Sequence, residues 1–139
     1  MAFLDSESML SVFTKVLDFK PLYEKKDEFA VGYTRYKLFD NVPPREFVTA
    51  TGGDQDGNKV IINSVEVNYP YPAVAGSVRG EVIVGGWILD PVDEKYTRIH
   101  YVSETDMKGE LPLDSIRKLA EEEGEIPFLI SEAIKKEQK

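Results

Sequence analysis

Few side chains in this sequence have the type and the spacing that catalysis requires. The chain has one histidine, His100, in the segment Thr97–Tyr101, and it has no cysteine. One histidine cannot build a histidine-rich metal site, and no motif of a serine or cysteine nucleophile accompanies it. His100 is therefore expected either to hold one hydrogen bond in or beside the core, or to serve as a polar group in the wall of a pocket.

Glu104 and Asp106 are a close pair of carboxylates near His100, and in a β-strand they share one face. General acid–base catalysis needs a further titratable group beside such a pair, and no motif supplies one. We therefore expect these carboxylates to be solvated or to form salt bridges.

The glycine-rich segment Gly52–Gly57 is a weak candidate for ion binding. A phosphate-binding loop needs a basic residue and a following helix, whereas this segment carries Asp54 and Asp56 and precedes a strand-like stretch. An EF-hand calcium loop needs a twelve-residue ligand spacing and a terminal glutamate, and both are missing. The segment is predicted to be the turn of a β-hairpin.

Composition limits the classes of partner. The chain has 139 residues and a formal net charge of −8. The length suits a single domain over residues 1–139, and the negative charge argues against nucleic acid as a partner. The lack of cysteine fits a reducing compartment, no apolar run approaches the roughly 20 residues of a membrane span, and the first residues lack the features of a signal peptide. We therefore expect a cytoplasmic protein, with its acidic run over residues 121–125 on a solvated helix face.

Alternating apolar and polar residues, rich in β-branched and aromatic types, predict a β-sheet. Repeated hairpins, rather than an alternation of strands and helices, indicate an antiparallel meander. The predicted strands are Phe19–Lys25, Phe29–Phe39, Arg45–Thr51, Asn58–Val67, Gly80–Leu89 and Thr97–Glu104.

Two segments have the helical period instead. Ser6–Val16 is predicted to form a short helix near the N-terminus. From Leu113 to Ile134 apolar residues recur on one helical face, with interruptions at Gly124 and Pro127, which predicts one kinked helix or two consecutive helices. The fold class is therefore α+β, and a curved sheet under a covering helix can enclose a cavity whose walls look like ordinary core in sequence.

Five short motifs follow one another from Pro44 to Pro112. They are Pro44-Arg45-Glu46-Phe47-Val48, Gly76-Ser77-Val78-Arg79-Gly80, Gly86-Trp87-Ile88-Leu89-Asp90-Pro91, Thr97–Tyr101 and Asp106-Met107-Lys108-Gly109-Glu110-Leu111-Pro112. In order and spacing this series resembles the C-terminal two thirds of a START domain, the lipid-transfer domain related to steroidogenic acute regulatory protein. The resemblance extends over roughly Val16 to Lys136.

The resemblance implies a helix-grip fold, in which a curved antiparallel sheet packs on a long C-terminal helix over a hydrophobic tunnel that holds one lipid. It implies no cofactor, no metal and no catalysis, and it implies transient contact with a membrane while the helix opens as a lid about a hinge at Lys108-Gly109. Most of the N-terminal part of a START domain has no counterpart in this chain, which leaves an exposed sheet edge. A homodimer through that edge, or a smaller and remodelled cavity, is the expected response.

Period-2 alternation, combined with the resemblance, predicts the residues that line the tunnel. They are Gly32, Thr34, Tyr36, Arg45, Phe47, Thr49, Thr51, Trp87, His100, Ile116, Leu119 and Phe128. Sterol-binding members carry a buried acid–arginine pair at the positions of Gly32 and Thr51, so sterol specificity is not carried over. Arg45 is expected either to hold a lipid headgroup or to form a structural salt bridge.

The predicted function is the non-catalytic binding and intracellular transfer of a lipid, whether a phospholipid, a sterol or another class. The alternative is a protein-interaction module built on a START fold without a full lipid cavity. An enzyme with a small ligand in the same cavity is the third reading.

Overall fold

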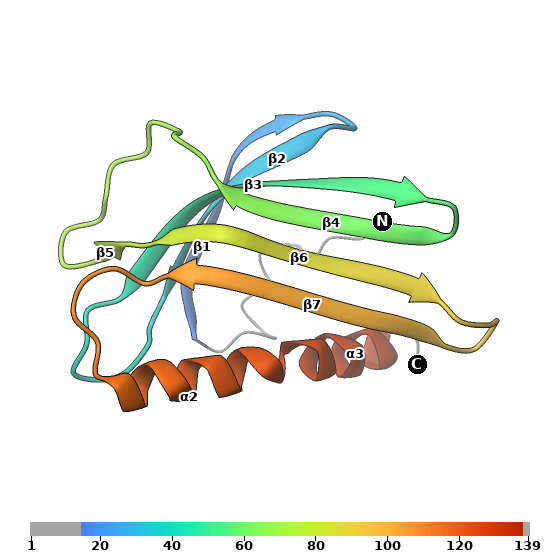
Figure 1. The fold of residues 1–139 in the computed structure, drawn as a ribbon. Helices are drawn as coiled ribbons and strands as arrows, with labels where there is room; N and C mark the ends of the chain where they lie inside the picture. The colour runs from blue at the N-terminus through green and yellow to red at the C-terminus, as the bar shows by residue number, and fades with distance from the viewer. Residues whose placement is uncertain (1–14, 138–139) are drawn as a thin grey trace.

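A computed structural model describes residues 15–137 of the chain (Figure 1). Its strands are β1 (Val16–Lys25), β2 (Phe29–Tyr36), β3 (Arg45–Asp56), β4 (Lys59–Glu66), β5 (Val78–Arg79), β6 (Glu81–Pro91) and β7 (Thr97–Asp106), and its helices are α2 (Leu113–Gly124) and α3 (Ile126–Glu137). The helix predicted over Ser6–Val16 lies outside the described residues, except that Val16 is the first residue of β1.

The strands form one sheet in the order β1-β2-β3-β4-β6-β7, with each neighbouring pair antiparallel. The predicted meander is therefore confirmed. Sequence reasoning missed β5, a two-residue strand that pairs in parallel with the start of β3 and is too short to show a periodic pattern. It also ended β3 too early, because the strand continues through the glycines to Asp56 and turns at Gly57, whose φ is +61°.

The sheet curves, so that β6 and β7 lie in front, β1 and β3 pass behind them, and α2 and α3 run along the lower side (Figure 1). The α+β helix-grip fold predicted from the sequence is confirmed. The C-terminal segment is two consecutive helices that separate at Glu125, whose N–H donates to the carbonyl of Glu122 at 3.1 Å. Neither of these helices is long and apolar enough to span a bilayer.

The strand register defines two faces of the sheet, because paired residues share a face and successive residues alternate. The Glu123 carboxyl of α2 lies beside Tyr36, Tyr101 and Ser103. We therefore call the face that carries these three strand residues the inner face, and the opposite face the outer face.

The best-packed region lies on the outer face. Val31, Tyr33 and Val48 are buried there, and the loop over residues 67–77 covers them with Tyr71 and Val74 among other side chains. Ring centroids of Tyr33 and Tyr71 are 4.5 Å apart. The outer-face core is thus complete without any contribution from the helices.

Candidate functional site

The strand register places most of the predicted lining residues on the inner face. Gly32, Thr34 and Tyr36 of β2 stand opposite Thr49, Phe47 and Arg45 of β3. Thr51 is two residues beyond Thr49 and therefore shares this face. Thr51 is paired with Ser64 of β4, so Ser64 and Ile62, two residues before it, also lie on this face. Trp87 of β6 is paired with Ile62 and therefore lies on the inner face as well.

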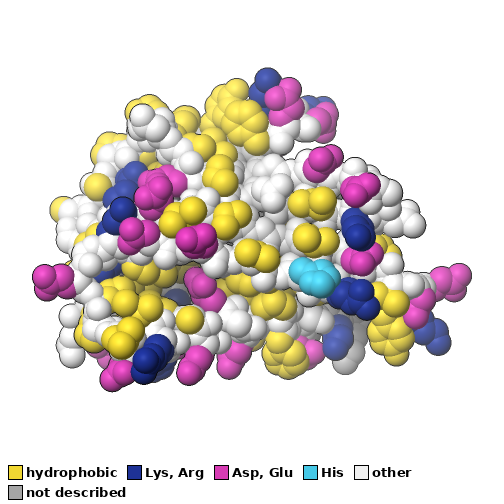
Figure 2. All heavy atoms as spheres, in the orientation of Figure 1, with side chains coloured by type: hydrophobic (Ala, Val, Ile, Leu, Met, Phe, Trp, Pro, Cys, Tyr) yellow, Lys and Arg dark blue, Asp and Glu magenta, His cyan; other side chains and the backbone are white. Residues whose placement is uncertain are grey.

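The other four predicted lining residues are Ile116 and Leu119 of α2, Phe128 of α3, and His100 of β7. Leu119 is buried beneath the helix, whereas the side chains of Ile116 and Phe128 are 48% and 65% exposed. His100 is exposed on the outer face, opposite Ile88, and Figure 2 shows this single histidine at the surface. The cause is strand alternation: the next residue along β7, Tyr101, takes the inner face, so His100 cannot.

Aromatic side chains form much of the inner wall. The rings of Trp87 and Tyr101 lie 4.6 Å apart between centroids, and Tyr36 meets Phe47 edge-on at 5.8 Å. A Cβ at Gly80 would overlap the Phe47 ring, so the position has space only for glycine. Burial raises the pKa of Tyr36 to about 12, and it also raises the pKa of Tyr101. The aromatic rings of this wall are therefore partly shielded from solvent, and their phenols keep their protons at neutral pH.

Arg45 begins β3 beneath the connection to α2, and its side chain is almost completely buried. Its Nε donates to the Met107 carbonyl at 2.7 Å, Nη1 to the Pro43 carbonyl at 2.6 Å and Nη2 to the Lys108 carbonyl at 3.1 Å. Burial lowers the pKa of the Arg45 guanidinium, which nevertheless stays protonated at neutral pH. The partners of Arg45 among the described residues are thus backbone carbonyls, in place of the carboxylate or the headgroup expected from the sequence.

Two of these hydrogen bonds, to the carbonyls of Met107 and Lys108, hold the approach to α2. Lys108 and Gly109 both have positive φ, 53° and 66°, so the chain turns sharply just before α2. A Cβ at Gly109 would lie 3.1 Å from Nη2 of Arg45, which leaves little space for any other residue there. The hinge predicted at Lys108-Gly109 is therefore a tight turn that is held from below by β3.

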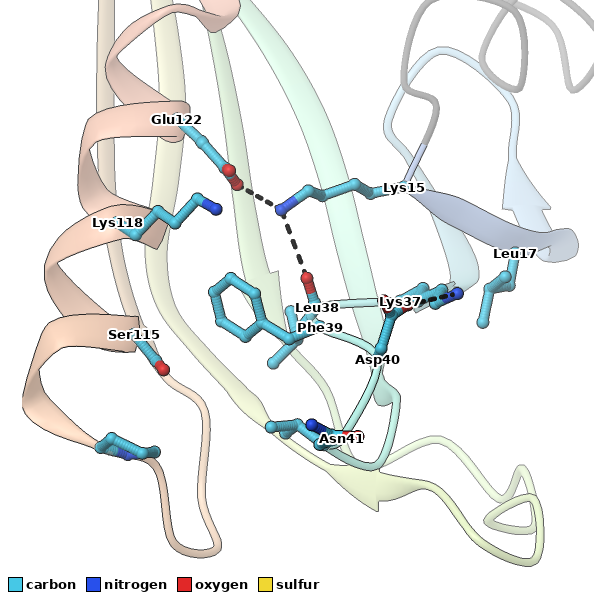
Figure 3. Close-up of a pocket in the computed structure, with 12 residues that line it drawn as sticks. Lys15, Leu17, Lys37, Leu38, Phe39, Asp40, Asn41, Ser115, Lys118 and Glu122 are labelled. Carbon is cyan, nitrogen blue, oxygen red and sulfur yellow. Dashed lines mark hydrogen bonds and ion pairs between the residues drawn. The ribbon is translucent and has the colours of Figure 1, made fainter.

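A cleft of about 670 Å³ opens between the start of β1, the connection from β2 to β3, and α2 (Figure 3). The Lys15 ammonium is ion-paired with Glu122 of α2 and donates to the Leu38 carbonyl at 3.4 Å. The ammonium groups of Lys15, directly before β1, and of Lys118, on α2, lie 5.1 and 5.5 Å from the centroid of the Phe39 ring. These contacts join α2 to the far edge of the sheet.

A second cleft of about 500 Å³ lies at the other end of β3, and its lining includes Gln55, Val60 and Leu89. The connection before β3 lines the first cleft and the last residues of β3 line the second, so the inner-face side chains of this strand lie between the two. None of the predicted lining residues borders either cleft.

The outer face carries a buried ion pair. Glu46 is fully buried, and its carboxylate accepts hydrogen bonds from the Tyr33 hydroxyl at 2.7 Å, from Arg79 Nε at 3.0 Å and from the Val74 N–H at 3.1 Å. Burial alone would raise the pKa of Glu46, but these hydrogen bonds outweigh it and the pKa is lowered. Since Arg79 also donates to the Tyr71 carbonyl at 3.0 Å, the cluster fastens the loop over residues 67–77 to the sheet.

Nothing in the described part of the chain forms a metal centre: residues 15–137 contain no group of three or more histidine, cysteine or acidic side chains that could hold an ion. Glu104 and Asp106 point to the outer face, where Asp106 accepts from the Lys108 N–H at 2.9 Å and shapes the turn. The expectation that these carboxylates form local salt bridges is met for Asp106, which lies 3.1 Å from the Lys108 ammonium.

Sequence reasoning missed three polar residues of the inner face, namely Ser64, Ser103 and Glu123. The alternations Val60, Ile62, Ser64 in β4 and Ile99, Tyr101, Ser103 in β7 could have indicated the first two. Glu123 was expected on a solvated helix face together with its acidic neighbours, but its side chain turns toward Tyr36 and Tyr101.

Comparison with known proteins places this geometry in a family. The family model of the START domain matches residues 26–126. Human STARD10 has a TM-score of 0.79 and 22% identity over 95% of this chain and 54% of its own, and human StAR-related lipid transfer protein 5 has a TM-score of 0.83 and 20% identity over 94% of this chain and 65% of its own. A STAR-related lipid transfer protein of Xanthomonas axonopodis has a TM-score of 0.63 and 18% identity over 78% of this chain and 60% of its own.

These solved structures share the fold, and this chain spans between about half and two thirds of the length of each. No curated protein matches the sequence.

Proposed function

Because the chain belongs to the START domain family, we propose that it binds one lipid on the inner face of its sheet and carries it between membranes without catalysing a reaction. The solved structures that share its fold include proteins named for lipid transfer. The proposed site of action is the cytoplasm, with transient contact at a membrane surface.

The aromatic inner wall is the observation that carries this proposal. The inner face offers an apolar surface of aromatic side chains, made by Tyr36, Phe47, Trp87 and Tyr101. Burying an acyl chain contributes about 0.8 kcal/mol per methylene. A site of this kind can therefore compete with a bilayer for a lipid.

We propose Gly32, Thr34, Tyr36, Arg45, Phe47, Thr49, Thr51, Trp87 and Leu119 as residues that line or support the site. His100 leaves this set, because its side chain is on the outer face. Ile116 and Phe128 are exposed on the helices, which suits contact with a membrane better than contact with an enclosed lipid.

Native mass spectrometry of the protein purified from cells, followed by lipid extraction, tests the proposal. We expect one lipid bound per chain, and we expect a Thr49→Trp variant, which fills the inner face, to lose at least tenfold in uptake of a fluorescent acyl lipid from vesicles. A Val102→Trp variant, with the same new side chain on the outer face, should keep its uptake. Empty protein that takes up no labelled lipid would sink the proposal.

A second candidate function is a protein-interaction module, and the outer face of β4, β6 and β7 favours it. Val65, Ile88 and Val102 are exposed there, Val102 to 56%, among charged side chains (Figure 2). Within the described residues β7 pairs only with β6, so its second edge is available for a homodimer. Size-exclusion chromatography with light scattering distinguishes this reading, which predicts a dimer that Val102→Glu dissociates while lipid uptake is unchanged.

A further inference from the structure

A row of small polar residues crosses the inner face from strand to strand. Thr51 of β3 is paired with Ser64 of β4, Ser64 with Gly85 of β6, and Gly85 with Ser103 of β7. Glu123 of α2 lies beside Ser103 at the end of this row. We call Thr51, Ser64, Gly85, Ser103 and Glu123 the polar belt.

The polar belt has hydrogen-bonding capacity to spare. The Thr51 and Ser64 hydroxyls share one hydrogen bond of 2.6 Å, which uses one of their two O–H groups and leaves the other to donate. Ser103 shares a hydrogen bond of 3.2 Å with Thr105, again between two hydroxyls. Each of these two hydroxyl pairs can thus donate one hydrogen bond to a ligand and also accept one from it. Alcohol and amide groups of a ligand can use both kinds of bond.

The next rows along the strands are apolar. Ile62, Trp87 and Tyr101 form the first row beyond the polar belt, and Val60, Leu89 and Ile99 form the second. Val60 and Leu89 also line the 500 Å³ cleft. A molecule with a polar head on the belt would therefore lay its apolar part along these rows, toward that opening.

Charge on the inner face decides what kind of head fits. Among the described strand residues of this face the one cation is Arg45, and its guanidinium already donates to three carbonyls. The charged group at the polar belt is instead the acid Glu123. A phosphate head would therefore be buried beside a carboxylate without a cation, which is unfavourable.

We propose that the polar belt binds the uncharged head of a lipid that carries hydroxyl or amide groups, with its acyl chains over the apolar rows, and that it selects against phosphate-bearing lipids. This inference rests on the proposed lipid binding and specifies the class of lipid. It follows from the hydroxyl pairs, the apolar rows and the absence of a free cation among the described strand residues of the inner face.

Competition between two lipids with the same acyl chains tests the proposal. The full chain is incubated with phosphatidylcholine vesicles that contain equal amounts of dioleoylglycerol and dioleoyl phosphatidic acid, re-isolated, and examined by native mass spectrometry. We expect dioleoylglycerol to exceed each of the two phospholipids at least tenfold in the bound fraction. Phosphatidic acid or phosphatidylcholine as the main bound lipid would overturn the selectivity and leave lipid binding intact, whereas no bound lipid would overturn both.

Variants of the polar belt test whether its hydroxyls cause the selectivity. Thr51→Val and Ser103→Ala should each lower the ratio of dioleoylglycerol to phosphatidic acid by about fivefold, as expected for one lost hydrogen bond. Thr51→Ser keeps the hydroxyl and should keep the ratio, which separates hydrogen bonding from damage to the fold. Thr97→Val, at an exposed threonine of β7, is the matched control. An unchanged ratio in Thr51→Val and Ser103→Ala would refute the role of the belt.

Discussion

The two faces of the sheet are built on different physical terms. On the outer face Tyr33, Val48 and Glu46 are buried, and the carboxylate of Glu46 has three hydrogen-bond donors. On the inner face, hydroxyls pair with one another and most side chains keep some exposure beneath helices that are joined to the sheet at few points. The comparison indicates that the outer face holds the better-packed core of the sheet.

The attachment of the helices follows the same division. α2 is tied to the sheet by the buried Leu119, by the ion pair of Lys15 with Glu122, and by Arg45 beneath its hinge. None of these contacts involves the outer-face core. We therefore expect the outer-face core to stay folded when the contacts of α2 are broken.

The strongest test of this division is removal of the buried carboxylate. Glu46→Ala leaves the Arg79 guanidinium and the Tyr33 hydroxyl without their acceptor, so we expect the free energy of unfolding to fall by about 3–4 kcal/mol. Urea denaturation followed by circular dichroism measures this change. In the same variant, hydrogen exchange should rise first in residues 67–77, because that loop is fastened through Glu46.

Glu104→Ala is the matched control for that experiment, because Glu104 is an exposed glutamate on the outer face. Its substitution should change the free energy of unfolding by less than about 0.5 kcal/mol. Equal losses in the two variants would contradict the view that the Glu46 cluster holds the outer face together.

A smaller effect is expected from Arg45, on the other side of the same strand. Arg45→Met keeps most of the buried volume but leaves the carbonyls of Pro43, Met107 and Lys108 without a donor, at a cost of about 2 kcal/mol. Because the bonds to Met107 and Lys108 hold the turn before α2, hydrogen exchange should rise in α2, while β2, which carries Val31 and Tyr33 of the outer-face core, stays protected. Arg98→Met, at an exposed arginine, is the control. Faster exchange in β2 than in α2 would mean that the two faces unfold together.

Much of the fold could be predicted from the sequence, because strands and helices leave periodic signals. Alternation in Phe29–Phe39 and Thr97–Glu104 and the helical period after Leu113 predicted the sheet and its covering helices, and the two strands are observed at Phe29–Tyr36 and Thr97–Asp106. β5 could not be predicted, since two residues have no period and their parallel pairing depends on a long-range contact. The continuation of β3 to Asp56 was hidden by glycines that are more common in turns.

Less of the candidate site could be predicted, because it depends on register and on helix rotation. Alternation assigned the faces of β2 and β3 correctly within each strand, yet His100 and Trp87 were assigned to one wall although their strands put them on opposite faces. The polar belt needs the pairing of four strands at once. Arg45 was recognised as important, but no local pattern reveals that its partners would be carbonyls 62 and 63 residues away.

The smallest expected effect is the change of stability with pH. It has opposite signs for Glu46 on the outer face and Glu123 beside the inner face. The lowered pKa of Glu46 means that its contribution to stability is present above the ordinary value of 4.5 and is lost as pH falls through the lowered pKa. Burial raises the pKa of Glu123, and the nearby Ser103 hydroxyl offsets only part of that shift. The contact of α2 with the inner face is therefore most stable below pH 4.5 and weakens as pH rises through the raised pKa.

Glu123→Gln should remove this dependence, because the amide stays neutral and the facing phenols of Tyr36 and Tyr101 keep their protons over the same range. We expect exchange of α2, corrected for its intrinsic pH dependence, to rise a few fold from mild acid to neutral pH in the parent chain and to stay level in the variant. The fluorescence of Trp87, the only tryptophan of the chain, should follow the same course. Glu121→Gln, at an exposed position of the same helix, should behave as the parent does. If hydrogen exchange of α2 in the parent chain does not change with pH, Glu123 is as well solvated as its neighbours. The two faces would then not differ in how their stability responds to pH.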